Sequence, residues 1–164
     1  MTIEATPLSP AIGALVRGVD LSRPLDEATQ AALRRVFYDH VILLIRDQRL
    51  DEDQLLRAGG FLGTVGKRGR PSAVLRESNP FITKVSNIRE NGRLIGSLPD
   101  GEMLFHADAS FFEMPHRASF LYAVEVPSVG GNTLFANMYK AYELVPDALR
   151  RRLEQVLHAS RRLD

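Results

Sequence analysis

Residues 118–126 are the clearest strand in the sequence, because they combine aromatic, aliphatic and β-branched side chains and end at Pro127. This composition next to a turn residue predicts a β-strand. Further strands are predicted at residues 11–16, 41–45 (buried on both faces), 81–85, 88–95 (a hairpin turning at Asn91-Gly92), 104–108 and 133–135. Many short strands need a second layer to bury their apolar faces, so we predict a β-sandwich or jelly-roll core.

Helical patterns occupy the two ends of the chain. The predicted helices span residues 26–39, 51–61 and 138–144, with a last helix beginning at Pro146. Asp26 and Asn137 stand at N-cap positions, where a side-chain oxygen accepts a hydrogen bond from a backbone N–H of the first turn. Since no linker divides the chain, we predict one mixed α+β domain over residues 1–164, with the helices flanking the β core.

Charge and composition exclude several classes of protein. The 164-residue chain carries 21 basic and 20 acidic residues, a formal net charge of +1, whereas nucleic-acid-binding domains are usually strongly basic. No cysteine is present, which excludes disulfides and thiolate metal sites. The longest apolar run, residues 41–45, is too short to cross a membrane, and no apolar signal-peptide region opens the chain. We therefore expect a cytoplasmic protein without nucleic-acid or membrane partners.

His106 and Asp108 form the candidate site, with one residue between them. On a strand, residues two apart project to the same face, so an imidazole nitrogen and a carboxylate oxygen would share one small volume. This donor pair suits a first-row divalent ion and supplies two-thirds of the 2-His-1-carboxylate triad of non-haem iron sites. An H-x-D triplet also arises by chance, with a structural histidine, and the triplet alone leaves both interpretations open.

The order of several segments resembles the TauD/TfdA family of Fe(II)- and 2-oxoglutarate-dependent dioxygenases. The most specific parts are His106-Ala107-Asp108 and Gly130-Gly131-Asn132-Thr133, at a separation similar to that in the family. The amino-terminal segments 8–14, 18–25 and 41–48 are similar to the opening of the same family. The resemblance therefore extends through nearly the whole chain.

The resemblance implies a double-stranded β-helix, a jelly-roll variant, in which His106 and Asp108 hold Fe(II). It also implies that the Thr133 hydroxyl helps to hold the far carboxylate of 2-oxoglutarate, since a hydroxyl can donate a hydrogen bond to an anion. The implied reaction hydroxylates a small, mostly anionic organic substrate and releases succinate and carbon dioxide. Without the resemblance, residues 130–133 would be an ordinary turn. Phe105 departs from the family, which often has tryptophan there, and we expect little consequence for the metal.

The family pattern also includes a second metal-binding histidine and an arginine that grips 2-oxoglutarate, both far downstream of the H-x-D triplet. The other histidines here are His40, His116 and His158, and each fits a surface or core position better than a ligand position. We therefore expect a domain incomplete at its carboxyl end and truncated before the distal metal ligand. It would be a fragment, or half of an assembly completed by a second copy or a complementing chain. The alternative function is a non-catalytic remnant or interaction module of the same fold.

Lys67, Arg68 and Arg70 lie in a loop predicted over residues 63–79. The simpler interpretation is a solvated basic loop. The functional interpretation is that these cations attract an anionic substrate to the mouth of a site. Neither interpretation selects a particular substrate.

Overall fold

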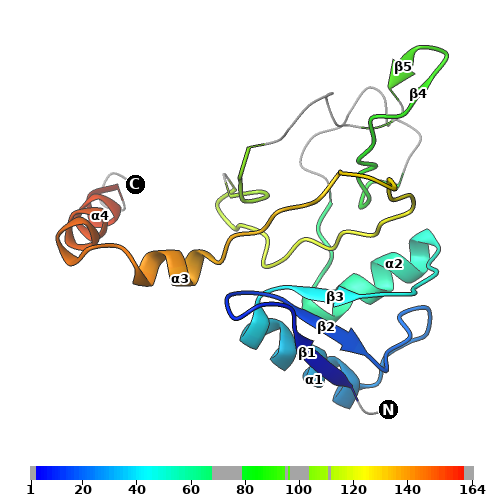
Figure 1. Ribbon diagram of the computed structural model, residues 1–164, viewed down its shortest axis with the longest axis horizontal. Helices are drawn as coiled ribbons and strands as arrows, with labels where there is room; N and C mark the ends of the chain where they lie inside the picture. Colours follow the sequence, from blue (N-terminus) through cyan, green and yellow to red (C-terminus); the bar gives the residue numbers. More distant parts are fainter. Residues whose placement is uncertain (1–2, 68–78, 95, 97–103, 111, 161–164) are drawn as a thin grey trace.

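The computed structural model describes residues 3–67, 79–94, 96, 104–110 and 112–160 (Figure 1). Its elements, in chain order, are β1 (Glu4–Pro7), β2 (Ala14–Arg17), α1 (Glu27–His40), β3 (Leu43–Ile45), α2 (Glu52–Gly59), the 3-10 turn η1 (Gly60–Leu62), β4 (Arg89–Glu90), β5 (Arg93–Leu94), α3 (Met138–Glu143) and α4 (Asp147–Ser160). None of the helices in this described part is long and apolar enough to cross a membrane.

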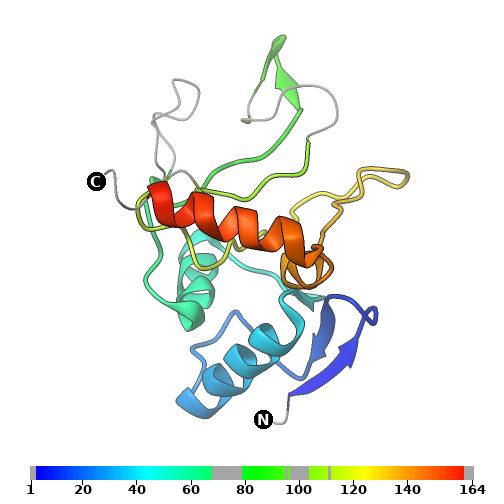
Figure 2. The same ribbon diagram turned by 90° about the vertical axis from the view of Figure 1, so that its left-hand side faces the viewer.

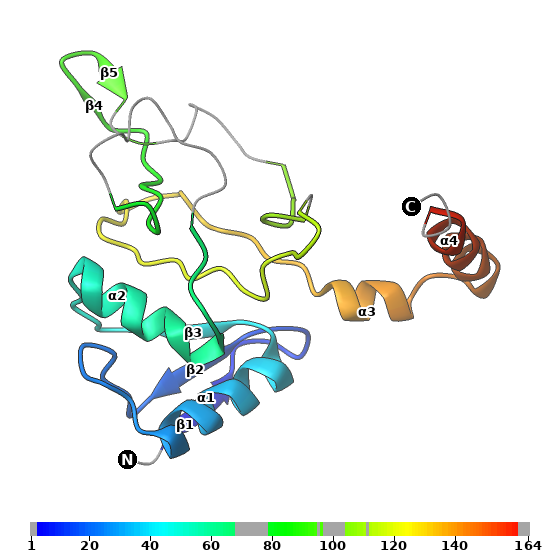
Figure 3. The same ribbon diagram turned by 180° about the vertical axis from the view of Figure 1, so that it is seen from behind.

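A three-stranded sheet with the order β1-β2-β3 organises the amino-terminal region. Strands β1 and β2 are antiparallel, with Glu4 opposite Arg17, whereas β2 and β3 are parallel, with Ala14 opposite Leu43. Parallel neighbours need a crossover connection, and α1 provides it. Figures 1 and 3, which view the molecule from opposite sides, show α1 along one face of this sheet. Strand β1 was not predicted, because its four residues are all exposed and have no apolar alternation.

The core lies between this sheet and the first two helices. Its buried members are Val16, Val19, Leu21, Leu33, Ala58 and Phe61. Asp26 and Asp51 are the N-cap residues of the two helices that enclose this core. The Asp26 side chain accepts a hydrogen bond from Thr29 N at 2.7 Å, and Asp51 forms a reciprocal capping box with Gln54. The predicted helices at residues 26–39 and 51–61 are therefore confirmed, the second ending in the 3-10 turn η1.

The strand predicted at residues 41–45 is shorter and less buried than expected. Only Leu43–Ile45 joins the sheet, and all three residues are half-buried. Val41 instead ends α1 with a φ of +66°, and its N–H donates to Phe37 O at 2.7 Å. The prediction of burial on both faces is wrong, because all three residues keep partial contact with solvent; among the described residues β3 pairs with β2 and lies at the edge of the sheet.

The middle of the chain differs most from expectation. The hairpin is confirmed: β4 and β5 flank Asn91 and Gly92, whose φ angles are +50° and +77°. The strand predictions at residues 81–85, 104–108, 118–126 and 133–135 are wrong for the described structure, in which these segments have no ladder partner. Apolar side chains there are solvent-exposed, including Leu104 (90%), Val124 (87%) and Val129 (88%). The predicted jelly-roll core is thus not formed among the described residues.

The carboxyl-terminal helices extend away from the sheet in Figure 1, and α4 lies in front of the rest of the chain in Figure 2. Asn137 caps α3 as predicted, accepting hydrogen bonds from the backbone N–H groups of the first turn. Its Nδ2 also donates to Ala11 O at 2.7 Å, and Lys140 Nζ donates to Pro10 O at 2.6 Å. These contacts join the start of α3 to the loop between β1 and β2. The prediction of a last helix after Pro146 is confirmed by α4.

Candidate metal centre

His106 and Asp108 lie in an irregular segment that leads into a turn, not in the predicted strand. Ala109 has a φ of +55°, which reverses the chain directly after Asp108. The two side chains nevertheless converge, because His106 Nε2 lies 3.2 Å from Asp108 Oδ1. Both remain accessible, with 53% of the His106 side chain and 58% of the Asp108 side chain exposed. The expectation that these two groups share one volume holds, although the segment that carries them is irregular and not a strand.

The orientation of the His106 ring is set by the backbone. Its Nδ1 lies 2.8 Å from Leu104 O, so Nδ1–H is the donor, and in the neutral imidazole the lone pair is on Nε2. A metal-binding histidine is usually held in this way, with the second ring N–H on a carbonyl or carboxylate. The free lone pair of Nε2 faces the same space as Asp108 Oδ1.

The spacing of these two atoms fits a common metal ion. Two ligands at right angles, each about 2.1 Å from a metal, are about 3.0 Å apart. The separation of 3.2 Å between Nε2 and Oδ1 is close to this value. One neutral nitrogen and one carboxylate oxygen also suit Fe(II) in chemical type. The residues present therefore fit two of the ligands of a facial iron site.

The second oxygen of Asp108 has a partner that sequence reasoning missed. Ser119 Oγ donates to Asp108 Oδ2 at 2.6 Å, across a separation of eleven residues. The only signal available beforehand was that Ser119 is a hydroxyl residue within the otherwise mostly apolar segment 118–126. That position was interpreted as part of a strand, which says nothing about a contact with the candidate site.

Electrostatics favour the protonated form of the free imidazole. The hydrogen bond to the Leu104 carbonyl is the largest cause of a raised His106 pKa, partial burial opposes it, and the charge and hydrogen bond of Asp108 add to it. A metal at Nε2 has to displace this proton. Metal binding at this site is therefore in competition with protonation of His106.

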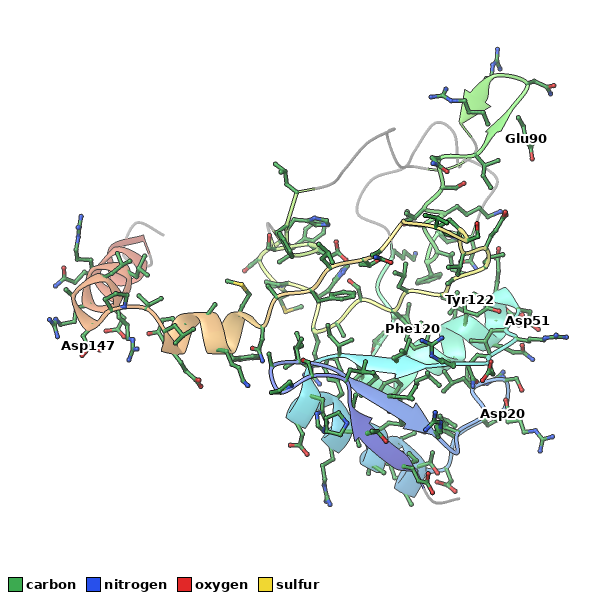
Figure 4. All side chains as sticks on the ribbon, viewed as in Figure 1. Asp20, Asp51, Glu90, Phe120, Tyr122 and Asp147 are labelled. Carbon is green, nitrogen blue, oxygen red and sulfur yellow. The ribbon has the colours of Figure 1, made fainter. Side chains whose placement is uncertain are left out.

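The segment that carries Ser119 is attached to the amino-terminal sheet region by Tyr122. The Tyr122 hydroxyl accepts a hydrogen bond from Leu50 N at 3.1 Å and donates to Gln48 O at 3.3 Å. Figure 4 shows Tyr122 beside Asp51, where this segment meets the start of α2. Arg117 Nη1 adds a contact to Leu62 O at 3.3 Å. These bonds fix the position of the segment that contacts Asp108.

The other predicted site residues lie in separate segments of the chain. Thr133 is exposed, after a turn in which Gly130 and Gly131 have φ angles of +74° and +66°. His40 is the last residue of α1, and the ring of His116 lies 6.1 Å from that of Phe112. Within the described ranges, no group of three histidine, aspartate or glutamate side chains could hold a metal.

The basic loop is described only at its start. Residues 63–67 are irregular, as predicted, and Lys67 Nζ lies 5.9 Å from the centre of the Phe81 ring. This distance is within the range of a cation–π contact. Arg68 and Arg70 lie outside the described residues, so the prediction that they attract an anion stays a prediction.

Comparison with known proteins defines the class to which this fold and site belong. The family model "Taurine catabolism dioxygenase TauD, TfdA family" matches residues 4–164. The chain belongs to the TauD/TfdA family, which uses Fe(II) and 2-oxoglutarate (alpha-ketoglutarate).

Individual relatives agree with this membership. The chain is 37% identical to pentalenolactone F synthase of Streptomyces avermitilis over 93% of its own length and 50% of that protein. It is 31% identical to the (S)-phenoxypropionate/alpha-ketoglutarate-dioxygenase of Delftia acidovorans, covering 94% of this chain and 53% of the relative. The chain is also 32% identical to the alpha-ketoglutarate-dependent sulfate ester dioxygenase of Pseudomonas putida, covering 92% of itself and 46% of the relative. It thus spans about half the length of the curated relatives it matches.

A solved structure supports the same assignment. A crystal structure of a Burkholderia xenovorans protein named as an alpha-ketoglutarate-dependent 2,4-D dioxygenase superimposes with a TM-score of 0.69 and 28% identity. The superposition covers 93% of this chain and 50% of that chain. The chain as a whole therefore has a fold similar to that of about half of this family member.

Proposed function

We propose that this chain supplies His106 and Asp108 as two iron ligands of an Fe(II)- and 2-oxoglutarate-dependent dioxygenase. The observation that carries the proposal is the 3.2 Å approach of His106 Nε2 to Asp108 Oδ1, with Nδ1 held on the Leu104 carbonyl. Family membership supports it, because several relatives are named as alpha-ketoglutarate-dependent dioxygenases. The complete enzyme would hydroxylate an organic substrate and release succinate and carbon dioxide.

Each group of this chain has a distinct task in the proposal. Bound iron supplies the oxidative chemistry that protein side chains lack. His106 and Asp108 would hold the ion through Nε2 and a carboxylate oxygen. The Leu104 carbonyl keeps the proton of His106 on Nδ1 and so keeps Nε2 free for the metal. The Thr133 hydroxyl donates a hydrogen bond to the far carboxylate of 2-oxoglutarate.

The turn before Thr133 has a steric requirement that agrees with this role. Gly131 has a φ of +66°, and a Cβ built there would lie 2.7 Å from Pro127 Cγ. A side chain at this position would therefore displace the turn. Glycine lets the chain fold tightly against Pro127 and then present Thr133, two residues later, at the exposed side of the segment.

The substrate we propose is a small organic anion. The relatives include proteins named for phenoxypropionate, sulfate esters and 2,4-dichlorophenoxyacetate, all of which carry a negative charge. Lys67 is a described cation that could face such a substrate, and its aromatic neighbour Phe81 offers an apolar surface beside the charge.

The remaining ligands have to come from residues beyond those described here. The described part holds no group of three candidate ligands, and the chain spans about half of its relatives. We propose that the irregular segments 104–108, 118–126 and 133–135 become strands of a jelly roll when further strands pair with them. The exposed apolar residues of these segments support this, since a paired second sheet would cover them.

A non-catalytic interaction module is the second candidate. The same exposed apolar residues, Leu104, Val124 and Leu134 among them, favour it, because large exposed apolar patches mark interaction surfaces. The two candidates differ in what they require of His106 and Asp108. A dioxygenase arm needs both side chains, whereas an interaction module does not need either.

The deciding experiment is anaerobic equilibrium dialysis of Fe(II) with and without 2-oxoglutarate. We expect the chain to retain Fe(II), to retain more when 2-oxoglutarate is present, and to lose both properties on Asp108→Ala. Glu113→Ala, an exposed carboxylate five residues away, is the matched control and should bind as the unchanged chain does. Fe(II) retention that is equal in all three proteins would reject the proposal and favour the interaction module.

A further inference from the structure

The two oxygens of Asp108 have different partners. Oδ1 lies 3.2 Å from His106 Nε2, whereas Oδ2 accepts the hydrogen bond of Ser119 Oγ at 2.6 Å. A distance of 2.6 Å is typical of a hydroxyl donating to an ionised carboxylate, which is among the stronger hydrogen bonds in proteins. One oxygen of this carboxylate is thus occupied by the protein itself, and the other remains directed at the proposed metal position.

From this division we infer that Ser119 is a positioning residue that makes Asp108 bind metal through one oxygen only. The inference rests on the proposed function, in which Asp108 is an iron ligand. A carboxylate can bind a metal through one or both oxygens, and the second mode uses an additional coordination position. A facial iron site needs its open positions for co-substrate and oxygen. By holding Oδ2, Ser119 keeps one of those positions free.

The position of Ser119 is in turn fixed by the folded amino-terminal region. Tyr122, three residues later, bonds to Gln48 O and Leu50 N. The Gln48 side chain accepts a hydrogen bond from the N–H of buried Leu21 at 2.8 Å. Ser119 is therefore attached, through a short segment, to a part of the molecule that has a packed core. A hydroxyl held in this way can restrict a carboxylate that is itself more than half exposed.

The test is a titration of the full 164-residue chain with Co(II) in the absence of oxygen. The Co(II) absorption bands report coordination number and geometry, which a purely structural role of Ser119 would not alter. We expect Ser119→Ala to weaken Co(II) binding about tenfold, the lower end of the range for lost second-shell partners. We also expect its bands to weaken and shift toward a higher coordination number, as Asp108 becomes bidentate.

Three further variants make the result decisive. Ser119→Thr keeps the hydroxyl and should restore the affinity and the spectrum of the unchanged chain. Ser128→Ala removes an exposed serine from the following turn and should have no effect. Asp108→Ala tests the proposed function itself and should abolish binding. Circular dichroism on each variant checks that the helices are retained.

The outcomes distinguish the ligand role of Asp108 from the positioning role of Ser119. If Asp108→Ala abolishes binding while Ser119→Ala leaves affinity and spectrum unchanged, the positioning role is overturned and the ligand assignment stands. If Ser119→Thr behaves like Ser119→Ala, the hydroxyl at position 119 does not restrict Asp108, and the inference is likewise overturned. If Asp108→Ala binds Co(II) as the unchanged chain does, or if the unchanged chain binds none, the proposed function fails and the inference fails with it.

Discussion

The hydroxyl of Tyr122 joins two distant parts of the chain, and its removal should have a local and measurable effect. The hydroxyl is the acceptor for Leu50 N–H at 3.1 Å and a donor to Gln48 O at 3.3 Å. Tyr122→Phe keeps the ring and deletes both bonds. A lost neutral hydrogen bond costs about 1 kcal/mol net, and the longer second bond adds less.

Amide hydrogen exchange of Leu50 measures this loss directly. A change of about 1 kcal/mol in the free energy of local opening corresponds to about a fivefold change in the opening equilibrium. We therefore expect the Leu50 amide to exchange about fivefold faster in Tyr122→Phe. The Leu21 amide, which donates to Gln48 Oε1 at 2.8 Å, should keep its rate.

The matched control is Tyr139→Phe, since Tyr139 is also a tyrosine but is 74% exposed and lies on α3. This variant should leave the Leu50 amide unchanged. An unchanged Leu50 rate in Tyr122→Phe would refute the reasoning, because the hydroxyl would then not protect that amide. Equal acceleration of every amide would also refute it, since that pattern indicates loss of global stability rather than release of one segment.

Other expected outcomes address the core, the glycine turn and the first helix. Leu33→Ala empties a fully buried position and should lower the free energy of unfolding by about 3 kcal/mol in a urea titration. Gly131→Ala should shift the NMR resonances of the turn at Gly130-Gly131, because its Cβ would lie 2.7 Å from Pro127 Cγ. Gly92→Ala, whose Cβ would meet no atom within 4 Å, should leave the resonances of the Gly130-Gly131 turn unchanged. Helix-capping hydrogen bonds lower the pKa of Asp26 below 3.8. The ionised Asp26 side chain therefore stabilises the folded chain above that pH, and this stabilisation is lost as the pH falls through the lowered pKa. The difference in urea midpoint between the unchanged chain and Asp26→Ala should accordingly be largest at about pH 6 and smallest at about pH 2.

Helices were predictable from the sequence because the information that specifies them is local. Asp26, Asp51 and Asn137 each lie directly before a helix, and each accepts a hydrogen bond from an N–H two or three residues later. The hairpin at Asn91-Gly92 was predictable for the same reason, since both residues take the positive φ that its turn needs.

Strands in the middle of the chain could not be predicted as well as the helices and the hairpin. A strand requires a neighbour to satisfy its backbone N–H and C=O groups, and composition cannot supply that neighbour. Residues 118–126 have the composition of a strand but no ladder partner among the described residues. Strand β1 shows the converse, because its exposed residues form a strand by pairing with β2.

In the candidate site, one contact was predictable from the sequence and another was not. The convergence of His106 and Asp108 was expected from their spacing, and it occurs in an irregular segment instead of a strand. The contact of Ser119 with Asp108 depends on how the segment around Tyr122 is attached to the sheet region. Such a contact is a property of tertiary structure, and no local pattern encodes it.

The most direct test of the central claim is whether the imidazole of His106 binds the metal. Pulsed electron paramagnetic resonance on the chain loaded with Mn(II) and 2-oxoglutarate, with histidine labelled by a nitrogen isotope, detects a coordinated ring nitrogen. We expect a histidine nitrogen coupling that disappears in His106→Ala and persists in His116→Ala. A coupling that survives His106→Ala, or no histidine coupling with Mn(II) bound, would contradict the assignment.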